Sequence, residues 1–309
     1  MSLRTVRAIR LCSFAWLLSC SLSLAAEPSQ SIVVHGHRGA RASRPENTIS
    51  AFQFAIAAGA HVLELDLAVT KDKILVVSHF PAINTGTATY PGERVCKGPA
   101  TRLPIYMLTL AQVREYDCGS NVLKEFPEQV AEPGSKIPTF EEVLDLAKGN
   151  NIEFNVETKI FPNHPELTPS PEEFVRLILE LVRKRQLESR VMLQSFDFRT
   201  LRAMKQQEPA IRRVALFGLP KYDSLMGITD PDKDFVSIAT KSGANILSPT
   251  MELVTPDSVK AAHSAGLAVV PYTVNKPEDW QTMVDAGVDG IITDDPAGLI
   301  TWLKLNRRK

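Results

Sequence analysis

The sequence carries no net charge, because its 309 residues include 35 Lys and Arg and 35 Asp and Glu. It has no basic stripe interleaved with aromatic residues, and this absence excludes broad binding of nucleic acid. It also lacks a dinucleotide-binding fingerprint, because Gly36-His37-Arg38-Gly39 does not have the GxGxxG spacing. The apolar run 11–24 is too short for a comfortable membrane span. We therefore expect a mature protein without a stable membrane span that binds a small molecule at a local site; no oligomeric state is predicted.

Cysteine is also scarce, and two of the four cysteines lie in a segment typical of a secretory signal peptide. Arginines at positions 4, 7 and 10 precede the apolar run, and Ala25-Ala26 follow it. This order predicts a signal peptide over residues 1–26 and export of a mature chain, 27–309, which would be periplasmic or secreted. The alternatives are an uncleaved membrane anchor and a lipoprotein modified at Cys20. Export exposes the chain to oxidising conditions, so we expect Cys96 and Cys118 to form one structural disulfide.

From residue 31 onward, short β-rich runs alternate with amphipathic helical patterns. Strands are expected over 32–37, 62–69, 73–79, 152–159, 191–196, 213–217, 245–249, 267–274 and 290–293. Helices are expected over 47–58, 140–148, 171–186, 198–207, 256–265, 277–286 and 297–305. Such repeated units predict an α/β fold, and roughly eight of them in about 280 residues favour a (β/α)8 TIM barrel over an open sheet. Residues 81–135 break the alternation, which predicts an insertion after the second barrel unit.

Carboxylates occur near the ends of two predicted strands. Side chains two residues apart on a strand share a face, so Glu64 and Asp66 should both point into the mouth of the barrel. Glu157 follows the same alternation on the next barrel strand. In such barrels the active site lies at the carboxyl ends of the strands, and three carboxylates there suit one divalent cation, either Ca²⁺ or Mg²⁺. The alternative for Glu64 and Asp66 is a structural ion pair with Arg38 or Lys159.

Two histidines and two cationic residues are expected at the same end of the barrel. His37 and His79 each end a predicted strand, and imidazoles titrate near neutral pH, so these residues are candidates for a general acid and a general base. Arg38 and Lys159 are suited to binding phosphate oxygens. Together with the carboxylates, these groups indicate a site for a phosphate ester. His35 is expected to be structural, because it points the opposite way from His37 or lies further down the strand. His35-Gly36-His37 also mimics the HxH metal pair of a metal-dependent amidohydrolase, but the two later strand-end histidines of that enzyme class are missing.

In their order, these motifs resemble the glycerophosphodiester phosphodiesterase family, in its exported bacterial form. The resemblance rests on His37-Arg38-Gly39, Pro45-Glu46-Asn47-Thr48, Glu64-Leu65-Asp66, His79, Ile137-Pro138-Thr139-Phe140-Glu141-Glu142-Val143-Leu144, Glu157-Thr158-Lys159, Gln194-Ser195-Phe196, Tyr272-Thr273-Val274-Asn275 and Gly290-Ile291-Ile292-Thr293-Asp294. It covers nearly the whole mature chain. It implies a (β/α)8 barrel that holds one divalent metal and releases glycerol phosphate from deacylated phospholipids.

The resemblance also implies a role for each matching residue. It makes Glu64, Asp66 and Glu157 metal ligands, His37 and His79 catalytic, and Arg38 and Lys159 phosphate contacts. Two positions depart from the family pattern: Phe80 stands where Asp is usual, and Tyr272, expected to line the glycerol pocket, stands where Trp is frequent. The reaction implied is metal-dependent hydrolysis of a glycerophosphodiester to sn-glycerol 3-phosphate and an alcohol. The alternatives are a related barrel phospholipase of sphingomyelinase D or phosphatidylinositol type, and a binding protein on a barrel that has lost its activity.

Overall fold

The computed structural model of the protein describes residues 31–88, 92–100, 103–218 and 234–306. The predicted signal peptide and Cys20 lie outside the described residues. Within those residues, no helix is both long enough and apolar enough to cross a membrane.

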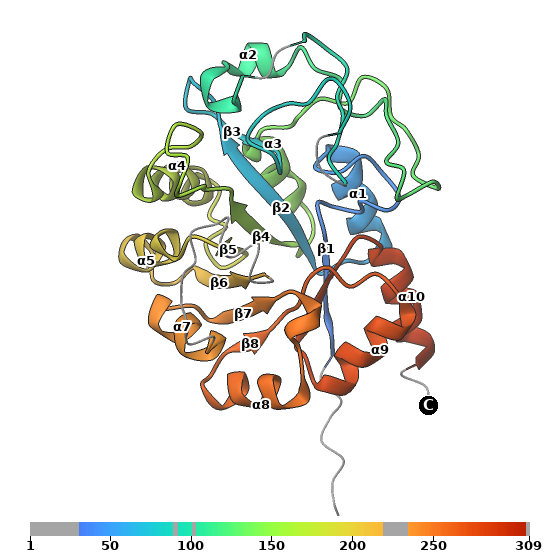
Figure 1. The fold of residues 1–309 in the computed structure, drawn as a ribbon, viewed down its shortest axis with the longest axis vertical. Helices are drawn as coiled ribbons and strands as arrows, with labels where there is room; N and C mark the ends of the chain where they lie inside the picture. Colours follow the sequence, from blue (N-terminus) through green and yellow to red (C-terminus); the bar gives the residue numbers. More distant parts are fainter. Residues whose placement is uncertain (1–30, 89–91, 101–102, 219–233, 307–309) are drawn as a thin grey trace, which may run out of the picture. The chain divides into compact units, whose positions relative to one another are not determined.

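Eight parallel strands form a nearly closed barrel in the described part of the chain (Figure 1). They are β1 (Val33–Gly36), β2 (Val62–Val69), β4 (Glu153–Thr158), β5 (Val191–Ser195), β6 (Arg212–Phe217), β7 (Ile246–Pro249), β8 (Ala268–Val269) and β9 (Gly290–Thr293). Neighbouring strands follow the order β8-β7-β6-β5-β4-β2-β1-β9. Backbone hydrogen bonds from Asp289 to Val269 (2.9 Å) and from Ile292 to Pro271 (3.0 Å) link β9 to the β8 segment. The predicted TIM barrel is therefore confirmed.

Helices surround the strands, and local sequence signals explain where they begin and end. They are α1 (Ile49–Ala58), α3 (Phe140–Leu144), α4 (Pro171–Lys184), α5 (Phe198–Gln207), α7 (Phe235–Ser242), α8 (Pro256–Ser264), α9 (Pro277–Ala286) and α10 (Pro296–Asn306). The side chain of Thr48 caps α1 by accepting the Ala51 N–H. Gly59 ends the same helix at φ 95°, a left-handed conformation that favours glycine. The short helix α7 was not predicted.

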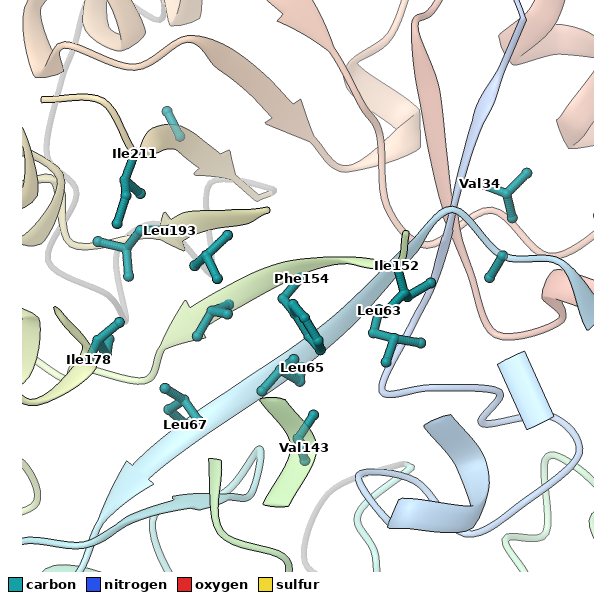
Figure 2. Packing of buried hydrophobic residues seen from close by; sticks show 14 of the residues in the cluster. Val34, Leu63, Leu65, Leu67, Val143, Ile152, Phe154, Ile178, Leu193 and Ile211 are labelled. Atoms are coloured by element: carbon teal, nitrogen blue, oxygen red, sulfur yellow. The ribbon is translucent and has the colours of Figure 1, made fainter. Parts of the chain in front are cut away.

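The main core lies between the barrel and the helices. Leu63, Leu65 and Leu67 of β2 are fully buried in it, beside Phe154 of β4 (Figure 2). Residues at alternate positions of β2 face the other way, into the barrel, where Val62 belongs to a separate apolar cluster. This alternation directs the polar side chains of β2 into the barrel interior.

The segment after β2 leaves the barrel. The strand β3 (Leu75–Val77) pairs antiparallel with β2, and the following residues form a short helical turn, η1 (Ile105–Met107), and the helix α2 (Leu110–Val113). This segment has its own apolar cluster, which includes Ile83, Val113 and Tyr116. The predicted disulfide between Cys96 and Cys118 is present, with an S–S distance of 2.06 Å. The described residues of this segment therefore pack around an apolar cluster of their own and carry a covalent cross-link.

Candidate active site

Three carboxylates meet where the middle of β2 pairs with the second half of β4. Glu64, Asp66 and Glu157 each contribute one oxygen to a group whose atoms all lie within 4.8 Å of one another, and all three residues are buried. The barrel register explains the arrangement, because Asp66 lies directly beside Glu157 in the β2–β4 pair and Glu64 lies one pleat below. The three residues predicted as metal ligands are thus brought together.

The electrostatics of this cluster suit a cation. Burial, and then the neighbouring charges of Asp66 and Glu157, hold the pKa of Glu64 well above its ordinary value. Burial likewise raises the pKa of Glu157 to about 7. The pKa of Asp66 is lowered: burial opposes this shift, but the adjacent His79, Lys159 and Arg38 outweigh it. The carboxylates repel one another, and the side-chain oxygen of buried Asn47 has no hydrogen-bond partner among the described residues. An oxygen-rich site of this kind fits Mg²⁺ or Ca²⁺.

Lys159 and Arg38 border the carboxylates. The ammonium nitrogen of Lys159 lies 2.7 Å from Glu157 Oε1 and 3.5 Å from Asp66 Oδ1, and Arg38 Nε lies 3.5 Å from Asp66 Oδ2. The ion pairs considered as an alternative to a metal site therefore exist. These ion pairs do not neutralise the negative charge of the cluster, however, because the pKa of Glu64 remains raised. Both cations are buried at its edge, where they can also reach phosphate oxygens.

His37 follows β1 and is held by the last strand of the barrel. Its Nδ1 lies 2.6 Å from Asp294 Oδ1, and its Nε2 lies 4.0 Å from Glu64 Oε2. The pKa of Asp294 is lowered to about 2; burial opposes the shift, but His37, Arg41 and hydrogen bonds outweigh it. Asp294 is therefore ionised near neutral pH and accepts the Nδ1 proton of His37. The side-chain nitrogen of Asn275 donates a hydrogen bond to Asp294 Oδ2 at 2.7 Å and so helps to hold that carboxylate in place.

His79 has a different environment. Its Nδ1 is buried without a hydrogen-bond partner among the described residues, and its ring makes an edge contact with the Phe80 ring at a centroid distance of 4.6 Å. Burial, followed by the charges of Arg38 and Lys159, holds its pKa well below the ordinary value. An aromatic ring cannot accept the imidazole proton as an aspartate would. With Phe80 at the position where the family usually has Asp, the described residues offer His79 Nδ1 no carboxylate of the kind that Asp294 offers His37.

The loop after β1 carries His37 and Arg38 and has a constrained backbone. Arg38 and Asn47 both lie in the left-handed region, with φ of 49° and 54°. Glu46 accepts hydrogen bonds from Arg38 Nη1 at 3.0 and 3.1 Å and from Arg41 Nε at 2.5 Å. The side-chain nitrogen of Asn47 donates to Asp66 Oδ2 at 2.9 Å. This loop therefore connects directly to the carboxylate cluster.

Residues of the cross-linked segment hold this loop from the outside. The side-chain amide of Gln129 donates to the carbonyls of Arg41 (2.7 Å) and Arg44 (3.0 Å), while its oxygen accepts the Leu123 N–H (3.1 Å). Arg94 Nη1 donates to the carbonyl of Glu46 at 2.7 Å. Sequence reasoning did not identify these contacts, because they join segments that are far apart in the chain.

The remaining residues named from the sequence occupy three different positions in the barrel. Tyr272 is half-buried at the carboxyl end of the β8 segment, where its hydroxyl donates to the Phe217 carbonyl at 3.0 Å and its ring faces the edge of Phe196. Gln194 of β5 donates to Glu64 Oε1 at 2.6 Å. His35 lies at the other end of the barrel interior, away from this site.

Comparison with known proteins identifies the same family as the motifs. Residues 37–298 match the model of the glycerophosphoryl diester phosphodiesterase family. A glycerophosphodiester phosphodiesterase from Caldanaerobacter subterraneus subsp. tengcongensis is 32% identical over 272 residues, which cover 88% of this chain and 98% of the relative. The crystal structure of a putative glycerophosphoryl diester phosphodiesterase from Silicibacter pomeroyi matches with a TM-score of 0.80 and 30% identity, covering 91% of this chain and 95% of that chain.

A further solved structure supports the fold. An Oleispira antarctica phosphodiesterase, whose structure was solved in complex with the product sn-glycerol-3-phosphate, matches with a TM-score of 0.68 at 20% identity, and the match covers 88% of this chain and 96% of that chain.

Proposed function

The chain belongs to the glycerophosphoryl diester phosphodiesterase family, and we propose that it hydrolyses glycerophosphodiesters to sn-glycerol 3-phosphate and an alcohol, using a divalent cation and two histidines. One observation carries this proposal: His37, His79, Arg38 and Lys159 surround a buried group of three carboxylates. That combination supplies charge neutralisation and proton transfer at one point. Both are needed to cleave a phosphate diester.

The carboxylates of Glu64, Asp66 and Glu157 would hold the cation, which when bound would withdraw charge from a phosphoryl oxygen. Arg38 and Lys159 bind the remaining phosphate oxygens. Glu46 fixes the guanidinium of Arg38 through two hydrogen bonds, so little side-chain freedom is lost when substrate binds. The half-buried ring of Tyr272 lines the glycerol pocket.

The two histidines move the protons. Because Asp294 accepts the Nδ1 proton of His37, the Nε2 of the neutral ring is free of a proton and faces the carboxylate end of the site. His37 therefore acts as the base that takes a proton from the attacking oxygen, which comes from water or from the glycerol 2-hydroxyl. His79 acts as the acid in its imidazolium form, which the negative charge of bound phosphate would favour against the lowering of its pKa by burial and by Arg38 and Lys159. The bond between phosphorus and the alcohol oxygen breaks, and that oxygen receives the His79 proton. If the glycerol hydroxyl attacks first, water opens the resulting cyclic phosphate in a second step.

The first experiment is to measure release of glycerol 3-phosphate from glycerophosphocholine by the purified mature protein with Ca²⁺, with Mg²⁺ and with a chelator. We expect release that requires the metal and is lost in Glu64→Gln. Full activity in chelator would refute the metal requirement, and near-normal turnover of His37→Ala would refute the catalytic role of that histidine. Glu153→Gln, at the amino end of β4, is the matched control for loss of a carboxylate.

One observation favours the phospholipase alternative. In the segment after β3, Leu103 and Met107 are about half exposed, at 49% and 48%. Exposed apolar side chains near a barrel mouth suit contact with lipid. The discriminating measurement is turnover of sphingomyelin, lysophosphatidylcholine and phosphatidylinositol vesicles beside glycerophosphocholine. Faster turnover of the intact lipids would replace the first proposal with this one.

We also propose that the protein is exported to the periplasm or secreted after cleavage near Ala26. The disulfide between Cys96 and Cys118 supports this, because structural disulfides persist in oxidising compartments. Cell fractionation and the mass of the purified protein test the proposal. A full-length chain recovered from the cytoplasm would contradict it, and a lipid-modified mass beginning at Cys20 would establish the lipoprotein alternative.

A further inference from the structure

Two buried side-chain amides form a chain of hydrogen bonds that ends on Glu64. Asn155 Nδ2 donates to Gln194 Oε1 at 2.8 Å, and Gln194 Nε2 donates to Glu64 Oε1 at 2.6 Å. Asn155, Gln194 and Glu64 are 0%, 1% and 2% exposed. In the proposed reaction, neither amide holds the cation or moves a proton. The chain therefore links a candidate metal ligand to two residues that have no other role at the site.

The register of the barrel brings these side chains together. Asn155 of β4 lies directly beside Glu64 of β2, and Gln194 of β5 lies directly beside Glu157 of β4. Side chains at alternate positions of a strand share a face, so Asn155 and Glu157 point into the same barrel interior. Because β4 lies between β2 and β5 in the sheet, the Gln194 side chain extends past one whole strand to reach Glu64.

Both carboxylate oxygens of Glu64 are held in this way. Its Oε2 accepts the backbone N–H of Arg38 at 3.0 Å, and its Oε1 accepts the side-chain N–H of Gln194. Each oxygen of an ionised carboxylate has two lone pairs, so each keeps one that a cation can use. The carboxylate plane is thus fixed before a cation binds, and a ligand that is already oriented loses little freedom on binding.

The direction of the hydrogen bonds is set at the Glu64 end of the chain. The ionised carboxylate that binds a cation only accepts hydrogen bonds, so Gln194 must turn its nitrogen toward Glu64 and its oxygen toward Asn155. Asn155 must then present its own nitrogen to Gln194. Its oxygen is left buried without a hydrogen-bond partner among the described residues. Such atoms are rare in native proteins, and this one indicates that the amides are oriented to serve Glu64.

Packing alone does not require polar side chains at these positions. One pleat below Glu64 and Gln194, the barrel interior is filled by Val62 and Met192, which belong to an apolar cluster. Replacement of both partners of a buried hydrogen bond by apolar groups of the same shape is close to neutral for stability. An apolar pair in place of Asn155 and Gln194 would therefore suit the fold as well, but it would leave Glu64 Oε1 without its donor.

From these contacts we infer that Gln194 and Asn155 are positioning residues for the candidate metal ligand Glu64. Gln194 orients the Glu64 carboxylate, and Asn155 keeps the Gln194 amide turned with its nitrogen toward that carboxylate. This inference rests on the proposed metal-dependent function and deepens it, because both residues act on the cation only through Glu64. Loss of an outer hydrogen bond to a metal-binding carboxylate typically weakens metal binding by about 10- to 100-fold.

Calorimetric titration of the mature protein with Ca²⁺ and with Mg²⁺ tests the inference without any substrate. Gln194→Met keeps the length of the side chain but removes its donor, so we expect the metal Kd to rise by about 10-fold or more. Asn155→Leu frees the Gln194 amide to turn, and we expect a smaller rise. If Gln194→Met does not fold, Gln194→Asn replaces it, because its amide is one methylene further from Glu64.

Thr158→Val is the matched control. Thr158 of β4 donates to Ser195 Oγ of β5 at 3.0 Å, so this variant loses a buried hydrogen bond between the same two strands. Its metal Kd should equal that of the wild type. A rise as large as that of the Gln194 variant would overturn the inference, because any loss of a bond between β4 and β5 would then have the same effect.

A double-mutant cycle tests whether the two amides act as one chain. If Asn155 acts only through Gln194, Asn155→Leu combined with Gln194→Met should bind metal no more weakly than Gln194→Met alone. Additive losses would overturn the chain. An unchanged metal Kd in the folded single variants would overturn the positioning role, even if those variants melt at a lower temperature. That result leaves the proposed function intact, whereas a wild-type protein that binds neither cation would refute the metal requirement and this inference together.

Discussion

The Nδ1 of His37 lies 2.6 Å from Asp294 Oδ1, so the residue that follows the first strand is oriented by the residue that follows the last strand. Asp294 is ionised, with its pKa lowered to about 2 by interactions that overcome burial, chiefly with His37. The carboxylate therefore selects the tautomer in which the imidazole Nε2 can accept a proton. Asp294 is a positioning residue in the proposed reaction and does not need to touch the substrate.

Replacement of Asp294 tests that role. Asp294→Asn keeps the size of the side chain but removes the preference for a proton on Nδ1, so we expect kcat to fall by about 10²-fold with KM little changed. Asp295→Asn is the matched control, because Asp295 caps the start of α10 through the Gly298 N–H and does not contact His37. Steady-state kinetics with glycerophosphocholine measures both. An equal loss in the two variants would indicate a structural effect.

Metal binding should raise the melting temperature through the three carboxylates. A cation present at 100 times its Kd stabilises the folded state by about 2.7 kcal/mol, and Glu64→Gln should remove most of this gain. Without metal, the variant should melt at or above the wild-type temperature, because one of three mutually repelling carboxylates is gone. Differential scanning calorimetry with Mg²⁺, Ca²⁺ and chelator makes the comparison. An equal metal-induced shift in both proteins would place the cation elsewhere.

Loss of the disulfide should affect stability and activity together. The bond joins Cys96 and Cys118, 22 residues apart, and in the chain-entropy model a loop of this length is worth about 3 kcal/mol. We expect Cys96→Ser with Cys118→Ser to unfold at lower denaturant concentration and to lose activity, because this segment holds the loop of His37 and Arg38. Full activity in the folded double variant would show that the segment does not position that loop.

Gln129 is a buried contact between that segment and the loop that carries His37 and Arg38. Gln129→Leu would leave the carbonyls of Arg41 and Arg44 without their donor, at a cost of about 1–3 kcal/mol for each buried unpaired group. We expect kcat to fall even well below the melting temperature, since the loop loses its fixed position. Gln281→Leu on the exposed surface of α9 serves as control and should retain wild-type turnover. A lowered melting temperature with normal kcat would limit Gln129 to a structural role.

The buried His35 should make the protein sensitive to acid. Its folded-state pKa is about 3, lowered by burial and then by Arg212, against an ordinary value of 6.5. The unfolded chain therefore binds the extra proton first, and stability present above pH 6.5 is lost as the pH falls toward 3, by up to about 1.4 kcal/mol per pH unit. In urea unfolding between pH 7 and 4, the free energy of unfolding should decline less steeply with falling pH for His35→Gln than for the wild type. His164→Gln, at an exposed position, is the control, and its free energy of unfolding should decline with pH as in the wild type. Equal slopes in the wild type and both variants would show that His35 is not the cause.

The barrel and the carboxylate cluster follow from patterns that are local in the sequence. Side chains alternate between the two faces of a strand, so Glu64 and Asp66 share one face of β2. The leucines at 63, 65 and 67 share the other face, and their burial in the main core confirms this division. Helix starts such as Thr255-Pro256 are recognisable because one side chain caps its own helix. These features depend on neighbours within a few residues, so one sequence is sufficient to predict them.

Other features depend on contacts that a local pattern does not contain. The strand expected over 267–274 is only Ala268–Val269, because Pro271 cannot donate a ladder hydrogen bond. The position of Asp294 at a strand end was visible in the sequence, but its pairing with His37 was not. The hydrogen bonds from Gln129 and Arg94 to the loop of His37 and Arg38 were also not predicted. The sequence of 120–130 and of 90–95 has neither a helical nor a strand period.

The distance along the chain between His37 and Asp294 has a consequence for biosynthesis. The two residues are 257 positions apart, and they meet only where the first strand pairs with the last. A chain still emerging from the ribosome, or still crossing a membrane amino end first, cannot assemble this pair until its final strand is delivered. In the proposed reaction, hydrolysis would therefore report completion of the barrel. Any premature stop before Asp294 would leave a chain with the sequence of most helices and strands but without the carboxylate that orients His37.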